Sequence, residues 1–293
     1  MSLSMRLTRS LLRFRPVSTK SAESVRDRVA HRKPSAPVAR GLRRVADVDE
    51  TIVNGRPVIE LTPKSGSGAS HLVYLYGGAY ISPMLNVHWR IITTLIRQSG
   101  ASVTVPQYGL APEHSVDDAY ALLDSIYDRL LVEKPGVRLF LAGDSSGGAL
   151  ALGQTMRLRD AGRSLPARVI LISPWLDATM SNPKVTALEP RDRILGRAGL
   201  VEAGRWWAGN HDPRSPLVSP TFGDLENLPP VHMYQGAWDL FAADAQDVTD
   251  NIRAAGGEAD LHLYPDAFHV FVGASWTPEA RAALRDIASL LRD

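Results

Sequence analysis

The chain has 293 residues, of which 44% are hydrophobic and 22% charged, so it is long and apolar enough to bury a sizeable core. Its formal net charge of +2 gives no strong overall field, which argues against nucleic acid or acidic substrates as partners. The sequence contains no cysteine, which excludes disulfides, thiolate metal sites and a cysteine nucleophile and fits a cytoplasmic location.

The N-terminal segment is basic. From Met1 to Ala22 the chain carries Arg6, Arg9, Arg13, Arg15 and Lys20 and no acid before Glu23. Such a segment is typical of a transit peptide, a membrane-surface helix or a surface helix of a lid. We favour the last interpretation and assign residues 1–45 to an N-terminal cap segment. No apolar run is long enough to cross a membrane, so no transmembrane segment is expected.

The next segments alternate between β-like and helical patterns. A hairpin is expected over residues 50–53 and 56–61, because Asn54 and Gly55 both tolerate the positive φ of a tight turn. Further strands are predicted at residues 71–76, 101–105, 137–141, 168–172, 231–234 and 260–264. Helices are predicted at residues 86–99, 148–161, 242–255 and from Pro278 onward. This rhythm predicts an α/β fold with a mostly parallel sheet flanked by helices.

One stretch interrupts the alternation. Residues 178–219 lie between two predicted strands and are too many for a simple connection. We therefore expect an excursion with helices of its own, one of them at residues 201–209 with Trp206 and Trp207. Together with the N-terminal segment, this insertion should form a helical cap.

The motif at residues 143–148 carries the clearest chemical signal. Gly143-Asp144-Ser145-Ser146-Gly147-Gly148 follows one predicted strand and precedes one predicted helix. A serine on so sharp a turn exposes its hydroxyl above the sheet, and side chains at the flanking glycines would clash. Ser145 is therefore the candidate nucleophile. The N–H of Ser146, at the start of the helix, is a candidate donor to an oxyanion.

A serine nucleophile needs a base and an acid that orients the base. His269 follows the last predicted strand, where ligands of a parallel sheet bind, whereas His232 and His262 lie within strands and His211 lies in the excursion. Asp239 follows the preceding strand and is the candidate acid. Asp244 is the alternative, although it falls inside the next helix, and Asp266 is too close to His269 in sequence.

These motifs resemble the bacterial hormone-sensitive-lipase-like esterases. Residues 143–148 are similar to that family's G-D-S-A-G-G motif, residues 108–114 to Y-R-L-A-P-E-H, and residues 173–177 share its S-P-W-L-D pattern. The resemblance implies an α/β-hydrolase domain over residues 46–293, short- to medium-chain ester substrates, no cofactor or metal, and often a homodimer. The excursion is most similar to members that open monoterpene ε-lactones.

The oxyanion loop departs from the family's H-G-G-G motif, because the chain has Tyr76-Gly77-Gly78-Ala79 there. The resemblance implies backbone donors at Gly77, Gly78 and Ala79, and alanine is compatible if its φ is negative. Tyr76 replaces a histidine that braces the loop in the family, and Gly109 replaces the arginine of Y-R-L-A-P-E-H.

The residues and the resemblance together predict a serine carboxylesterase that acts through an acyl-enzyme. Its substrates are expected to be uncharged and hydrophobic, because the candidate contact residues are large and apolar: Tyr80, Trp206, Trp207, Trp238 and Phe241. A lactone hydrolase with the same triad is one alternative, and a non-catalytic ligand-binding protein or a lipid-surface protein is another.

Overall fold

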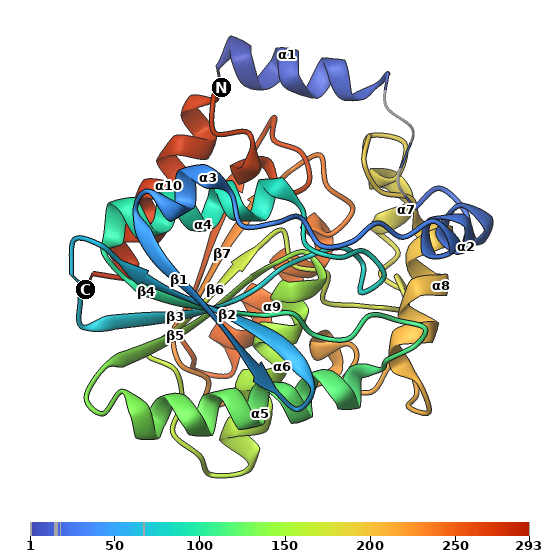
Figure 1. Cartoon of the computed structure of the whole chain (residues 1–293). Coiled ribbons are helices and arrows are strands. Elements are labelled where there is room, and N and C mark those ends of the chain that lie inside the picture. The colour runs from blue at the N-terminus through green and yellow to red at the C-terminus, as the bar shows by residue number, and fades with distance from the viewer. Residues whose placement is uncertain (1, 15–16, 18, 67, 293) are drawn as a thin grey trace.

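The computed structural model describes residues 2–14, 17, 19–66 and 68–292 (Figure 1). Met1 and Arg15 of the predicted basic segment lie outside the described residues.

An eight-stranded sheet forms the centre of the molecule, with strands in the order β1-β2-β4-β3-β5-β6-β7-β8. Only β2 runs opposite to the others, because it pairs antiparallel with both β1 and β4 while the remaining neighbours pair in parallel. The predicted mostly parallel sheet is confirmed. The strands are β1 (Ala46–Val53), β2 (Arg56–Pro63), β3 (Ser70–Leu75), β4 (Ser102–Pro106), β5 (Arg138–Asp144), β6 (Arg168–Ile172), β7 (Val231–Gly236) and β8 (Ala259–Tyr264).

The hairpin turn lies where its dipeptide predicts. Asn54 and Gly55 join β1 to β2 with φ values of 47° and 71°. Two consecutive positive φ values match the twist of the flanking strands. The register that follows places Val58 and Leu61 of β2 in the core.

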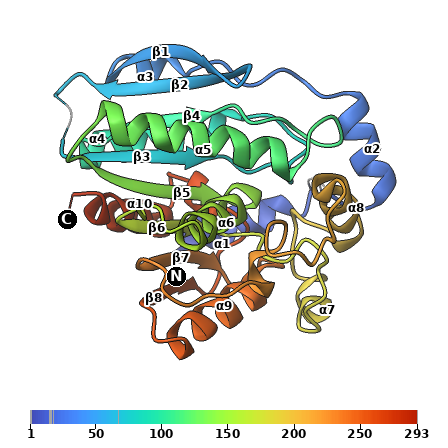
Figure 2. The ribbon, with the colours of Figure 1, turned by 90° about the horizontal axis from the view of Figure 1, so that it is seen from below.

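Helices cover both faces of the sheet (Figures 1 and 2). The helix α4 (Asn86–Ser99) packs against α10 (Pro278–Leu290) on one face, and the short α3 (Arg40–Arg43) lies on α4. The other face carries α5 (Val116–Glu133), α6 (Ser146–Asp160) and α9 (Ala242–Ala254). Four of these helices lie close to their predicted ranges. Helix α5 was not predicted from the sequence, although the capping box of Ser115 and Asp118 marks its start.

The predicted cap regions lie at the carboxyl ends of the parallel strands. In the N-terminal segment, α1 (Leu3–Leu12) lies against α10, whereas α2 (Ala22–Ala30) packs on α8 (Arg197–Ala208) of the excursion (Figure 1). Arg26 of α2 pairs with Glu202 of α8 at 2.7 Å. The excursion also contains α7 (Val185–Leu188). The two segments are thus joined to each other, as a composite cap would require.

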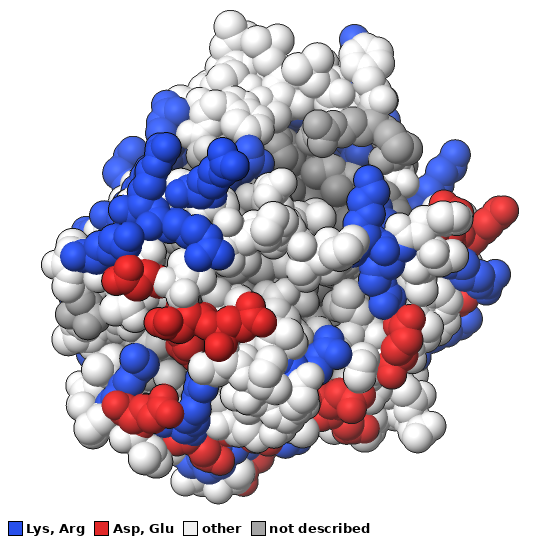
Figure 3. All heavy atoms as spheres, in the orientation of Figure 1, with Lys and Arg blue, Asp and Glu red and all other residues white. Residues whose placement is uncertain are grey.

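On the face shown in Figure 3, basic side chains gather below the N-terminal end of α1, over α3, whereas α1 itself presents mostly uncharged atoms to the viewer. The helix buries Met5 and exposes Leu3, Leu7 and Leu11. None of the helices in the described part of the chain has the length and apolarity needed to span a bilayer.

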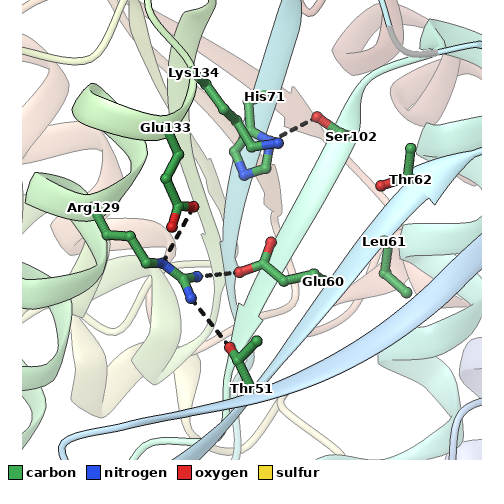
Figure 4. Close-up of a pocket in the computed structure, with 9 residues that line it drawn as sticks. All are labelled: Thr51, Glu60, Leu61, Thr62, His71, Ser102, Arg129, Glu133 and Lys134. Atoms are coloured by element: carbon green, nitrogen blue, oxygen red, sulfur yellow. Dashed lines mark hydrogen bonds and ion pairs between the residues drawn. The ribbon is translucent and has the colours of Figure 1, made fainter.

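A polar network crosses the sheet beside a small cavity of about 180 Å³ (Figure 4). Thr104 donates to Glu60 at 2.6 Å and lies 2.7 Å from His71 Nε2, while Ser102 lies 2.6 Å from Nδ1. Burial lowers the pKa of His71 to about 3, so the ring is neutral. Because Thr104 donates its proton to Glu60, Nε2 must donate to Thr104 and Nδ1 must accept from Ser102. His71, Ser102 and Thr104 therefore each have a partner.

We expect Thr104→Val to lower the free energy of unfolding by about 1–3 kcal/mol, because it leaves His71 and Glu60 each without one partner. Urea denaturation measures the change. Thr62→Val is the control, since Thr62 is exposed on β2, and should change stability by less than about 0.5 kcal/mol. Equal effects of the two substitutions would contradict the network.

Candidate active site

Ser145 lies at the turn between β5 and α6, in the conformation that a sharp strand-to-helix turn requires. Its φ of 53° and ψ of −123° are strained for a non-glycine residue. The turn is possible because glycines, which have no side chain, flank it. A Cβ atom at Gly143 would overlap the carbonyl of Gly147, and one at Gly147 would overlap the carbonyl of Leu75. The glycines of the motif are therefore dictated by close backbone contact.

The structure brings Ser145, His269 and Asp239 together from three separate loops. His269 Nε2 lies 3.0 Å from Ser145 Oγ, and its Nδ1 lies 2.8 Å from Asp239 Oδ2. The other oxygen of Asp239 accepts from the N–H of Phe241 at 3.0 Å. All three side chains are buried. The chain order and the loops are those that the sequence predicts.

The electrostatic surroundings favour a basic His269. Burial alone would lower the pKa of the ring, but the negative charge and hydrogen bond of Asp239 outweigh it and raise the pKa above its usual value. A raised pKa gives the ring a stronger affinity for a proton taken from Ser145.

The two alternative acids have other partners. Asp244 lies on α9, where its Oδ1 accepts from the side chain of Asn182 at 2.8 Å, and burial raises its pKa to about 7. Asp266 pairs with Arg9 of α1 at 2.6 Å. Within the described part of the chain, His269 Nδ1 bonds to the carboxylate of Asp239.

Three backbone amides near Ser145 are available as donors to an oxyanion. Among the described residues, the N–H groups of Gly78, Ala79 and Ser146 have no hydrogen-bond acceptor. The N–H of Gly77, also a predicted donor, instead bonds to the carboxylate of Asp144. Three of the four predicted backbone donors are therefore available to an oxyanion beside Ser145.

A cavity of about 740 Å³ opens above Ser145. Its apolar walls come from four parts of the chain that are distant in sequence, namely α1, the start of α4, the excursion and the His269 loop. The large apolar residues of the wall are Leu11, Leu12, Leu85, Val87, Ile194, Leu195, Phe268, Val270 and Trp276. None of these was predicted from the sequence, because no local pattern marks residues that meet only in the folded chain.

Comparisons with known proteins agree with this geometry. A family described as having the alpha/beta hydrolase fold matches residues 72–273. An acetyl-hydrolase of Streptomyces hygroscopicus is 34% identical over 75% of each chain, and an esterase of Acinetobacter venetianus is 31% identical over 77% of this chain and 76% of its own. The crystal structure of a hormone-sensitive lipase from a metagenome library superposes with a TM-score of 0.85 at 27% identity over 99% of each chain. The chain belongs to this α/β-hydrolase family. The resemblance to bacterial hormone-sensitive-lipase-like esterases is thereby confirmed, whereas the likeness to lactone hydrolases stays a prediction.

The oxyanion loop of this α/β hydrolase has an unexpected conformation at Ala79. Alanine was expected to be compatible with this position if its φ is negative, but the structure gives 54°, and Tyr80 follows with 60°. Two consecutive left-handed residues turn the loop back, so that Ser82 N–H donates to Gly78 at 2.9 Å. The condition of a negative φ is not met, because this return turn needs a left-handed conformation that glycine adopts more easily than alanine.

We therefore expect Ala79→Gly to raise the free energy of unfolding by about 1 kcal/mol and to leave ester hydrolysis active, because it relieves a left-handed alanine and keeps the N–H. Thermal unfolding measures the change. Ala282→Gly, on the exposed face of α10, should instead lower stability by about 1 kcal/mol. A loss of stability in both variants would contradict the strain at Ala79.

Tyr76 is buried and stacks on Tyr108 with ring centroids 4.6 Å apart, and the Tyr108 hydroxyl donates to the carbonyl of Tyr76. His88 of α4 lies beside the same ring, with its Nε2 3.4 Å from Asp144 Oδ2. Aromatic packing thus braces the loop where the family uses a histidine, and a histidine from another helix lies next to it.

The structure does not bring the five aromatic residues predicted as substrate contacts to the wall of the cavity. Tyr80 and Trp207 are buried and stack on each other at 4.0 Å. Phe241 is buried against His269, and Trp238 is covered by the guanidinium of Arg9 at 3.6 Å. Trp206 is half-buried on α8. These side chains hold the cap and the loops in place around the cavity.

Proposed function

We propose that this α/β hydrolase is a serine carboxylesterase in which Ser145 forms an acyl-enzyme with the substrate. The observation that carries the proposal is the hydrogen-bonded series Ser145–His269–Asp239 at the floor of the cavity, with distances of 3.0 and 2.8 Å. Ester hydrolysis agrees with the names of its relatives, an acetyl-hydrolase and an esterase.

In the proposed reaction, Ser145 Oγ attacks the ester carbonyl while His269 Nε2 takes the hydroxyl proton. Asp239 holds the ring through Nδ1–H and stabilises the imidazolium. The carbonyl oxygen becomes an oxyanion that accepts from the N–H groups of Ala79, Gly78 and Ser146, each worth about 3 kcal/mol in comparable sites. His269 then gives its proton to the leaving alcohol, and a water activated by the same ring releases the acid.

The cap is also part of the proposal. Residues 1–45 and the excursion at 178–219 contribute Leu11, Leu12 and Leu195 to the cavity wall. These apolar side chains favour an apolar acyl group in the cavity. The cytoplasmic location and the homodimer stay predictions from the sequence and from the family resemblance.

A chain-length series tests the proposed substrate class. We expect kcat/KM for p-nitrophenyl esters to rise by roughly fourfold for each added methylene, which corresponds to about 0.8 kcal/mol, until the cavity is full. The best substrates should lie in the acetyl-to-octanoyl range, with little hydrolysis of long-chain triglyceride emulsions. Several lactones belong in the same panel, because the same residues could open them.

Two results would contradict this account. A steady rise through palmitoyl esters with activation at an oil–water interface would indicate a lipase with an open site. A marked preference for lactones over every acyclic ester would replace the esterase by the alternative lactone hydrolase.

A further inference from the structure

A second buried carboxylate lies behind the proposed triad. Asp192 belongs to the excursion, between α7 and α8, and is 4% exposed. Its Oδ1 accepts from the backbone N–H groups of Ile194 at 2.7 Å and Leu195 at 2.9 Å. Its Oδ2 accepts from the N–H of Leu240 at 2.9 Å. One side chain thus bonds to two segments that are about 45 residues apart in the chain.

Leu240 directly follows the proposed acid. Its N–H donates to Asp192, and the N–H of the next residue, Phe241, donates to Asp239 Oδ1 at 3.0 Å. Consecutive amides are therefore divided between the two carboxylates. This arrangement fixes the backbone on which Asp239 stands and so limits the directions in which its Oδ2 can meet His269.

The other two bonds of Asp192 determine the shape of the cavity wall. Ile194 and Leu195 line the cavity above Ser145, and their amides are held by Asp192 Oδ1. The carboxylate consequently connects the wall that would contact substrate with the loop that would orient the base.

We propose that Asp192 is a positioning residue that fastens the excursion to the loop of the proposed catalytic acid, so that the cavity wall and the His269–Asp239 pair keep one arrangement. The inference rests on the function proposed above. It adds a role for a residue that touches neither substrate nor Ser145.

The negative charge of Asp192 should affect the pH dependence of activity, which a residue with a purely packing role would not do. Burial lowers the pKa of the His269 ring, and the charged groups with the largest opposing effects are Asp239, Asp192 and Asp144, all of which raise it. Asp192 itself faces Asp239 and His269, and burial and the like charge of Asp239 raise its pKa to about 6. Activity requires neutral His269, so it falls as the pH drops through the pKa of the ring. Removal of the Asp192 charge should therefore move this acid limb to lower pH.

Asp192→Asn is the direct test. The amide oxygen of asparagine can still accept from Ile194 and Leu195, but its NH2 group then meets the N–H of Leu240, and that bond is lost. We expect kcat for p-nitrophenyl butyrate to fall by about tenfold to hundredfold, with a smaller change in KM, because the His269–Asp239 pair is displaced from Ser145. The acid limb of kcat/KM should shift to lower pH.

Asp177→Asn is the matched control. Asp177 is also a buried carboxylate at the edge of the excursion, and it accepts from the N–H groups of Thr179 at 2.8 Å and Ser181 at 2.7 Å. The groups with the largest effects on the pKa of His269 are Asp239, Asp192 and Asp144, and Asp177 is not one of them. Its replacement should lower stability without moving the acid limb. Equal kinetic losses in the two variants with unmoved limbs, or an unchanged Asp192→Asn enzyme, would overturn the proposal.

The unmodified enzyme offers a test that needs no folded variant. An NMR titration of the His269 ring should depart from a one-proton curve, because the charge of Asp192, whose pKa is raised to about 6, acts on the pKa of the ring. A simple one-proton curve would contradict the proposed interaction between Asp192 and His269. Failure of the esterase proposal has a different signature, namely ester hydrolysis that survives the loss of Ser145.

Discussion

Ser145→Ala is expected to lower kcat for p-nitrophenyl butyrate by about 10⁴- to 10⁶-fold. The hydroxyl that lies 3.0 Å from His269 Nε2 would be gone, and neither the ring nor the oxyanion donors could form an acyl-enzyme. Binding and electrostatic stabilisation would leave only a small residual rate. The fold should persist, because the substitution removes one oxygen from a turn whose shape is set by glycines. Steady-state kinetics and a thermal unfolding curve measure both expectations.

Ser146→Ala is the control for this prediction. The proposed contribution of Ser146 comes from its backbone N–H, whereas its hydroxyl contacts the N–H of Tyr80 at 3.4 Å and bonds to the side chain of Tyr108. This variant should therefore keep most of its activity. Substantial turnover by Ser145→Ala, or an equal loss in both variants, would show that the nucleophile is elsewhere.

Asp239→Asn is expected to lower kcat by about 10⁴-fold. A neutral amide does not stabilise the His269 imidazolium as the carboxylate does. Its NH2 group also donates to Nδ1 and so holds the ring in the wrong tautomer. Asp244→Asn should cost little by comparison. Asp244 Oδ2 has no partner among the described residues and its pKa is already raised to about 7, so a neutral side chain is well tolerated there. Measured kcat values for both variants decide the assignment, and the reverse order of losses would move the acid to Asp244.

Much of the site could be predicted because its chemistry constrains short stretches of sequence. Gly143 and Gly147 signal a turn that no residue with a Cβ could form, and this turn positions Ser145. His269 and Asp239 could be found because the ends of parallel strands converge, so that loops after β7 and β8 meet the loop after β5. Their meeting depends on topology that hydrophobic alternation already indicates.

Other parts of the site depend on contacts between distant segments. The conformation of Ala79 is set by the return of the loop to Gly78, which nothing in the local sequence reports. The cavity walls and the bond from Asp192 to Leu240 join the excursion to the catalytic loops. Large aromatic residues were predicted to contact substrate for their size alone, yet Tyr80 and Trp207 are buried against each other because such surfaces gain most from mutual burial.

The most direct measurement of the central claim is labelling of the folded enzyme with a fluorophosphonate, followed by peptide mapping. The reagent reacts with a serine that a neighbouring base has activated. We predict one adduct per chain on Ser145, with a labelling rate that falls at acid pH as His269 is protonated, and no adduct in heat-denatured protein. An adduct on another residue, or no adduct on folded and ester-hydrolysing enzyme, would contradict the assignment of Ser145 as the nucleophile.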